Sequence, residues 1–183
     1  SWNYPEGELI LVKCYTNLDQ IEVFLNDESL GIFSKDADQD SINFTTSFRP
    51  GILRAQGCGG DTHVSHTLHT TKSPCQITLE CWKDFVQSPE EPFLYQIEAT
   101  VQDSDGNPVL SDSTLLDVTV ENGQLVGLEN GDLADVTDYA APYRRVYHGK
   151  LLIYVRPETT AHPTSVTVSG VNLKTAVLSL PLK

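Results

Sequence analysis

Residues 121–149 read ENGQLVGLENGDLADVTDYAAPYRRVYHG, and the turn residues of this segment indicate how the chain folds. Asn-Gly pairs at 122–123 and 130–131 flank the short apolar run 124–129. Asn-Gly reaches positive φ at little energetic cost and therefore favours tight turns. The segment predicts a turn, a strand and a second turn. Polar neighbours around its glycines exclude a membrane helix packed through small residues.

Short strands separated by turn residues continue in both directions from this segment. Residues 21–25 alternate with period two, Asn26 and Asp27 suit a two-residue hairpin turn, and residues 29–33 return. We expect strands at 9–15, 21–25, 29–33, 42–48, 52–56, 63–69 and 76–82, and again at 93–102, 115–120, 125–128, 150–156, 165–169 and 176–182. One short helical turn within residues 133–141 is the only helix considered. This pattern predicts an all-β protein made of β-sandwiches.

The pattern lapses at residues 83–92, KDFVQSPEEP, where two prolines and two glutamates remove ladder donors and apolar surface. We therefore expect a domain boundary there, with one immunoglobulin-like β-sandwich at 1–83 and a second at 84–183. A chain of 183 residues accommodates two such domains, since each needs about 100 residues or somewhat fewer.

Composition narrows the classes of partner. The net charge of −13 argues against nucleic acid and against anionic membrane surfaces, because both need clusters of Lys and Arg. No apolar run is long enough to span a membrane, and no signal peptide is visible. A chain that lacks methionine and starts at Ser1 is expected either to have lost its initiator and leader or to have been cut from something longer, and we favour the second.

Four cysteines, Cys14, Cys58, Cys75 and Cys81, all lie in the first half of the chain. They allow three disulfide pairings, but a chain of this size is not a typical disulfide framework. We expect buried free thiols, which favour the cytoplasm over export. Zinc is disfavoured because no CxxC pair is present.

The series His63, His66, His69 has the spacing of a metal motif on a helix, but it falls on an expected strand. There only His63 and His69 share a face, roughly 20 Å apart at about 3.3 Å per residue. One ion cannot bridge that distance. No metal site is predicted.

Paired carboxylates are what a glycosidase would need. Candidates on paper are Glu90 with Glu91, and Asp36, Asp38 and Asp40, all in polar or proline-rich loops that favour a solvated surface. The GxSxG, GxGxxG and GxxxxGK[ST] signatures are absent. We therefore predict no catalytic residue and no cofactor in this chain.

Sugar binding needs aromatic rings that stack on pyranose faces. Trp82, Tyr139 and Tyr143 are the candidate carbohydrate contacts, with Tyr147 as a further possibility. Bulky aromatics in small sandwiches more often fill cores or domain interfaces, so both interpretations stay open.

The opening 31 residues resemble the segment that follows the catalytic barrel in family 2 glycoside hydrolases, the β-galactosidase group. The resemblance rests, in order, on Trp2-Asn3-Tyr4, Tyr15-Thr16-Asn17 and the hairpin FLNDESLG at 24–31. Tyr4 stands where the family often has Trp, and Asp27 where it often has Gly. The FRPG turn at 48–51, followed by ILRA, fits the same pattern.

Similarity to the last immunoglobulin-like domain of that family covers the remainder. It rests on DSDGN at 103–107, GLENGD at 127–132, Arg145 and Gly149. The resemblance implies a part of a retaining, β-galactosidase-like enzyme that lies C-terminal to its (β/α)₈ barrel. The family's catalytic glutamates belong to that barrel, and no catalytic motif of the family falls on this chain.

Two functions remain in view. The first is a structural accessory region whose partners are the catalytic barrel and other domains of the parent chain, with contacts between parent subunits as a further option. The second is a carbohydrate-binding module that holds galactose-containing glycans near the active site. An independent enzyme is a third option, which would require paired carboxylates in a cleft.

Overall fold

A computed structural model describes residues 1–36, 38–59, 62–82, 94–158 and 162–180. Within these ranges the chain forms strands and no helix, so no helix long and apolar enough to cross a membrane occurs there. The chain divides into two compact units, Ser1–Thr71 and Lys72–Lys183. Their strands are β1 (Leu9–Tyr15), β2 (Gln20–Leu25), β3 (Glu28–Ser34), β4 (Ser41–Ser47), β5 (Ile52–Gly59), β6 (Thr62–His69), β7 (Gln76–Trp82), β8 (Tyr95–Gln102), β9 (Leu115–Glu121), β10 (Gly123–Glu129), β11 (Tyr143–Arg145), β12 (Lys150–Pro157), β13 (Ser165–Gly170) and β14 (Ala176–Ser179).

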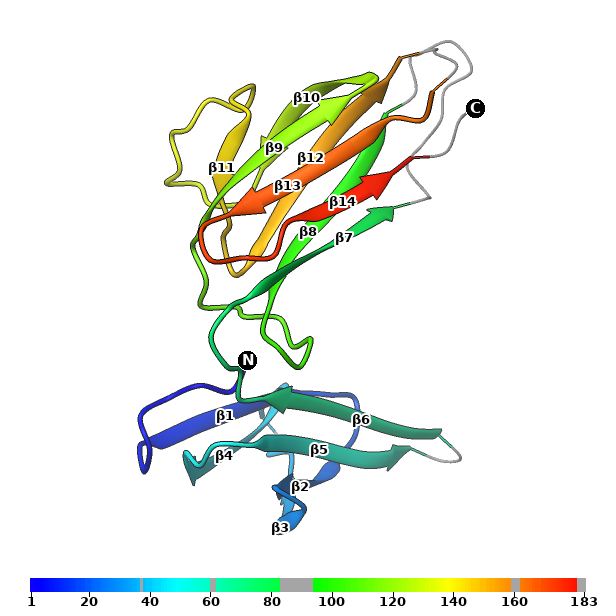
Figure 1. The fold of residues 1–183 in the computed structure, drawn as a ribbon. Coiled ribbons are helices and arrows are strands. Elements are labelled where there is room, and N and C mark those ends of the chain that lie inside the picture. The colour runs from blue at the N-terminus through cyan, green and yellow to red at the C-terminus, as the bar shows by residue number, and fades with distance from the viewer. Residues whose placement is uncertain (37, 60–61, 83–93, 159–161, 181–183) are drawn as a thin grey trace. The chain divides into compact units, whose positions relative to one another are not determined.

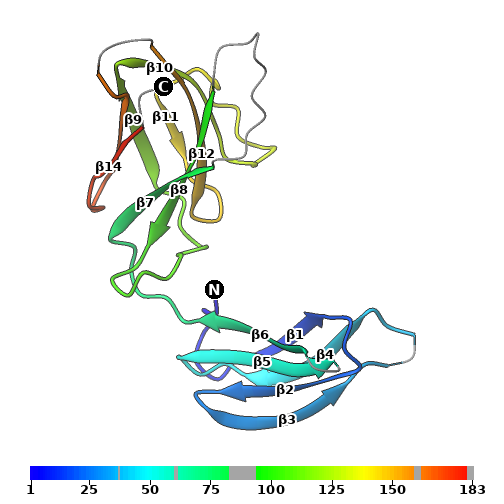
Figure 2. The same cartoon turned by 90° about the vertical axis from the view of Figure 1, so that its right-hand side faces the viewer.

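The first unit is a sandwich of the four-stranded sheet β3-β2-β5-β6 and the two-stranded sheet β1-β4, with antiparallel neighbours throughout (Figures 1 and 2). Period-two alternation turns one face of each strand inward. The core between the sheets contains Ile10, Ile21, Val23, Leu25, Ile42, Phe44 and Leu53. Trp2 joins it at 2% exposure, packs on Phe48 and donates its indole N–H to the Arg49 carbonyl at 3.1 Å.

The second unit pairs the sheets β10-β12-β8-β7 and β11-β9-β13-β14 (Figure 1). The central strands β8 and β12 present buried residues at every second position. Their inward side chains meet those of β9 and β13 in one core, which includes Ile97, Val101, Val118, Ile153 and Val168. At the sandwich edges, β7 lies beside β14 and β10 beside β11.

The boundary between the units differs from the one expected after residue 83. Strand β7 pairs with β8 over its whole length, from Gln76 opposite Gln102 to Trp82 opposite Gln96. Ile77 is buried in the core of the second unit, so β7 belongs there. The composition of residues 83–92 predicts a linker between domains, but the strands before and after this stretch, β7 and β8, pair with each other. The division falls instead between Thr71 and Lys72, within the strand-free residues 70–75.

The turn chemistry of the sequence is confirmed. Asn26 and Asp27 both have positive φ, 53° and 64°, as a two-residue hairpin between β2 and β3 requires. Asn122 and Gly131 also have positive φ, at the two ends of β10. The expected helical turn within residues 133–141 is absent, since bends and turns occupy that stretch.

Candidate functional site

The connection between β10 and β11, residues 130–142, has a defined path although it contains no strand or helix. Four side chains each accept a hydrogen bond from the backbone N–H two residues later, the Asx-turn pattern. The pairs are Asn130 with Asp132 (2.9 Å), Asp132 with Ala134 (2.9 Å), Asp135 with Thr137 (2.8 Å) and Asp138 with Ala140 (2.9 Å). The backbone polar groups of this connection are therefore largely satisfied by the connection itself.

Arg144, on β11, contacts three residues of this connection. Its side chain is fully buried, and Nη2 donates to the carbonyl of Thr137. Nη1 lies 3.4 Å from Oδ2 of Asp135, and the guanidinium carbon lies 4.5 Å from the centre of the Tyr139 ring. Nε and Nη1 make no hydrogen bond to any described residue. A buried cation thus fixes three points of the connection.

Two carboxylates with shifted pKa values, Asp103 and Asp135, accept hydrogen bonds within turns of the chain. Hydrogen bonds from the hydroxyl and backbone N–H of Thr137 are the main cause that lowers the pKa of Asp135. For Asp103, burial is the largest single influence, and it raises the pKa. Hydrogen bonds from the backbone N–H groups of Lys72, Asn107 and Asp105 and from the Asn107 side chain lower the pKa, and together they outweigh burial. The net pKa of Asp103 is lowered, so both groups stay ionised and hold loops.

The same connection carries an exposed apolar surface, which we call the 133–147 surface. Leu133 and Val136 are fully exposed, at 103% and 97%. Tyr139, Tyr143 and Tyr147 follow in the sequence and are each between 43% and 58% exposed, and the name includes them. Side chains of this kind on a fixed loop are available for contact with another molecule or another part of a longer chain.

The structure does not bring the three predicted sugar contacts together. Trp82, 51% exposed, ends β7 at one edge of the sandwich, whereas Tyr143 begins β11 at the opposite edge. Tyr139 lies near Tyr143 in sequence, but Arg144 stacks on one face of its ring. A continuous platform of the three rings is therefore absent.

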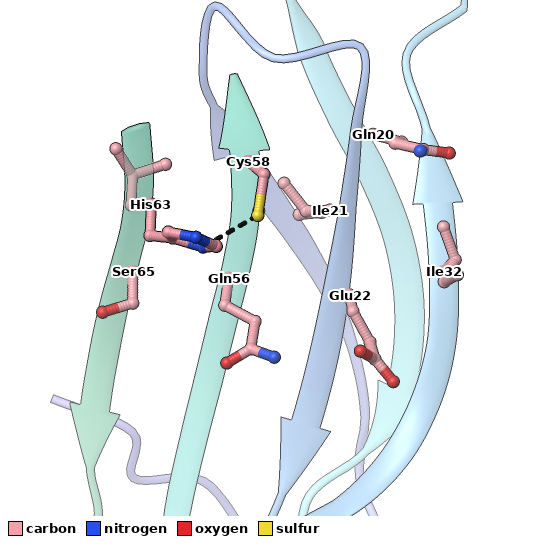
Figure 3. Close-up of a pocket in the computed structure, with 10 residues that line it drawn as sticks. Gln20, Ile21, Glu22, Ile32, Gln56, Cys58, His63 and Ser65 are labelled. Atoms are coloured by element: carbon pink, nitrogen blue, oxygen red, sulfur yellow. Dashed lines mark hydrogen bonds between the residues drawn. The ribbon is translucent and has the colours of Figure 1, made fainter. Parts of the chain in front are cut away.

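A second surface feature lies on the outer face of the four-stranded sheet in the first unit. Its hollow has a volume of about 420 Å³ and is lined mainly by hydrogen-bonding side chains. Figure 3 shows Gln20 and Glu22 on β2, Gln56 and Cys58 on β5, and His63 and Ser65 on β6. The hollow was not foreseen, because it arises from cross-strand register rather than from any sequence motif.

A third feature is an apolar groove of about 680 Å³ in the same unit. It lies between the two sheets, where the two-stranded sheet β1-β4 meets the inner faces of β5 and β6. Its lining includes Val12, Cys14, Phe44, Ala55, Val64, His66 and Leu68.

The remaining candidates for chemistry do not assemble. Asp36, Asp38 and Asp40 are exposed, and Glu90 with Glu91 lies outside the described residues. Along β6, His63, His66 and His69 stand opposite Cys58, Ala55 and Ile52 respectively. The described part of the chain holds no group of three or more His, Cys, Asp or Glu side chains suited to a metal ion.

Comparison with known proteins places the fold. Residues 90–179 match the family described as glycoside hydrolase family 2 C-terminal domain 5, and residues 7–65 match a domain of unknown function, DUF4982. The β-galactosidase BoGH2A of Bacteroides ovatus is 25% identical over 182 residues, which are 98% of this chain and 21% of that protein.

Solved structures agree with this match. A β-glycosidase from Bacteroides vulgatus superposes with a TM-score of 0.88 at 26% identity, covering 99% of this chain and 24% of that one. A glycosyl hydrolase family 2 member from Bacteroides cellulosilyticus gives 0.87 at 25% identity, covering 98% and 25%. The chain thus spans between 21% and 25% of the length of these relatives.

The two units, and the solved structures that superpose on nearly the whole chain, define the class of protein: tandem all-β sandwiches of the immunoglobulin-like kind. The match is specific for the second unit: residues 90–179 are similar to a C-terminal domain of glycoside hydrolase family 2, and β-galactosidase and β-glycosidase relatives cover nearly the whole chain.

Proposed function

We propose that this chain is a non-catalytic accessory region of a β-galactosidase-like family 2 enzyme, and that it packs against the catalytic barrel and other domains of the same parent. The observation that carries the proposal is the 133–147 surface. Leu133 and Val136 contribute nothing to the core, yet the loop that presents them is fixed by the buried Arg144. Apolar side chains displayed in this way suit an interface within a longer chain.

The carboxylates support the non-catalytic part of the proposal. A glycosidase needs a general acid whose pKa is raised, together with a second carboxylate a short distance away. Among the residues that the structure describes, the two carboxyl groups with shifted pKa values are Asp103 and Asp135, and both have lowered values and accept hydrogen bonds within loops. Their environments serve turn formation.

Hydrolysis of an aryl β-galactoside tests this directly. We expect no turnover by the purified 183-residue chain above a heat-denatured control. Sustained turnover that is lost in a Glu90→Gln, Glu91→Gln double variant would overturn the proposal, because those adjacent carboxylates are the candidates that the described residues do not cover.

A carbohydrate-binding module is the second candidate function, favoured by one observation: Trp82, Tyr139 and Tyr143 are all about half exposed. Their separation at two edges of the sandwich counts against a single extended site. Titration of the isotopically labelled chain with galactose-containing oligosaccharides discriminates the two functions. The accessory role predicts no chemical-shift change at millimolar sugar, whereas saturable shifts at any of these three rings would establish the binding module.

A further inference from the structure

Cys58 and His63 face each other across neighbouring strands on the outer surface of the first unit. They are register partners of β5 and β6, and Sγ of Cys58 lies 2.9 Å from Nδ1 of His63 (Figure 3). Both residues are exposed. With the ring proton on Nε2, the imidazole accepts the thiol proton through Nδ1.

The backbone around Cys58 fixes its outward direction. Its neighbours Gly57 and Gly59 turn toward Leu18, where an added Cβ would lie 2.6 Å and 2.8 Å from the two Leu18 methyl carbons. Because side chains alternate along a strand, Cys58 must point to the opposite face. There it borders the hollow, whose lining combines the polar residues Gln20, Glu22, Gln56 and Ser65 with the apolar Ile21, Ile32 and Val64.

The other three thiols have different surroundings. Cys14, Cys75 and Cys81 are partly buried, whereas Cys58 is exposed. Burial raises the pKa of the Cys14 thiol, which disfavours its nucleophilic thiolate form. Cys14 and Cys81 also pack against the hydrophobic cores of their units. Cys58 is thus the thiol that a reagent in solution reaches, and it has a base in contact.

We propose that Cys58, with His63 as its proton acceptor and the adjoining hollow as the docking surface, is a thiol-modification site that forms mixed disulfides with low-molecular-weight disulfides. Sγ attacks one sulfur of the reagent, so that a new S–S bond forms and the reagent's own S–S bond breaks. The leaving thiolate keeps the electron pair. The thiol proton passes to Nδ1 and then to the leaving thiolate, so Cys58 is oxidised while half of the reagent is reduced to a thiol.

Acidic surroundings favour a cationic reagent, since Glu22 lines the hollow and the chain carries a net charge of −13. Cystamine, a disulfide with two ammonium groups, is therefore the probe. The reduced 183-residue chain is treated with cystamine near neutral pH, quenched with acid and mapped by peptide mass spectrometry. We expect Cys58 to be modified at least about tenfold faster than each of the other cysteines.

Two matched histidine variants test whether His63 speeds the modification of Cys58 or whether exposure of the Cys58 thiol alone accounts for the rate. His63→Gln should slow modification of Cys58 at least about tenfold. His66→Gln, three residues further along β6 and on its opposite face, should leave the rate within about twofold. In urea the preference for Cys58 should vanish, because it depends on the folded strand pair. Equal rates at all four cysteines in the folded chain, or a His63→Gln rate equal to wild type, would overturn the proposal.

Discussion

The guanidinium carbon of Arg144 lies 4.5 Å from the centre of the Tyr139 ring, and the arginine side chain has no exposed surface. Five residues apart in sequence, the two belong to different structural contexts, because Arg144 is the middle residue of β11 and Tyr139 lies in the connection that precedes it. The contact joins the sandwich to the loop that carries the 133–147 surface.

Replacement of Arg144 by leucine should destabilise the second unit. The change removes the ion pair with Asp135, the hydrogen bond to the Thr137 carbonyl and the stacking on Tyr139. We expect the free energy of unfolding to fall by about 3 kcal/mol, since one partner of a buried pair is lost. Urea denaturation of the second unit measures it. Arg145→Leu, at an exposed neighbouring position, is the control and should cost well under half as much; equal losses would contradict the role given to Arg144.

Asp103 should give the second unit a stability that depends on acid pH. Its pKa is lowered in the folded state, so its contribution is complete above the unfolded value of about 3.9 and is lost as pH falls through the folded value. Asp103→Asn should cost about 2 kcal/mol at about pH 7, because a buried charge-assisted acceptor is lost. The difference between the two proteins should shrink as the pH falls below about 4 and should vanish once it has passed through the lowered pKa of folded Asp103. A difference that stays constant between neutral and acid pH would show that the carboxylate charge is irrelevant.

Gly51 should tolerate no side chain. It has φ of 133°, and an added Cβ would lie 1.7 Å from Oδ1 of Asn26. That amide donates to the Pro50 carbonyl and accepts from the N–H of Ile52, so it cannot move without losing both bonds. We expect Gly51→Ala to destabilise the first unit by about 3 kcal/mol or more.

Gly7→Ala is the matched control for Gly51. Gly7 also has positive φ, 81°, but an added Cβ would meet nothing within 4 Å. Only the backbone term remains, which is about 1 kcal/mol. Thermal unfolding of both variants compares the two costs, and similar shifts in the unfolding temperature would mean that the Asn26 contact is unimportant.

If the proposed accessory role holds, the 133–147 surface is dispensable for folding of the 183-residue chain but necessary for the stability of the longer parent chain. The double variant Leu133→Asp, Val136→Asp should change the stability of the 183-residue chain by no more than about 0.5 kcal/mol, because both side chains are exposed. In the full-length parent the same variant should lower the thermal unfolding temperature. Val171→Asp, at an exposed apolar position elsewhere in the unit, should not. Identical behaviour of the two variants in the parent would contradict an interface at this surface.

The fold class could be predicted because the turns and strands depend on local residue patterns. Positive φ at Asn26 and Asn122 depends on the residues themselves, so the turns and the strands between them could be placed without tertiary information. The domain boundary depended on strand pairing. Residues 76–82 form an equally good strand in either sandwich, and only packing of Ile77 in the second core decides between them. Composition at 83–92 therefore misplaced the boundary.

The candidate sites were less accessible from sequence. Two of the aromatic rings flagged as sugar contacts flank Arg144, but no local signal distinguishes an arginine that is buried from one that faces solvent. The three-residue strand β11 is too short for alternation to be recognised, although Arg144 within it and Val146 just after it are both buried. The pairing of Cys58 with His63 likewise requires the β5–β6 register.

The side chains that set the path of the loop, those of the Asx turns and of Arg144, are bonded to the backbone or buried in the sandwich. Leu133 and Val136 instead face solvent. Substitutions at those two positions can therefore accumulate without disturbing the scaffold. During divergence of the family, this separation would let the outer residues change in step with whatever surface they meet, while the same inner set keeps the loop's course. We expect sequence drift in the loop to be concentrated at its outward positions.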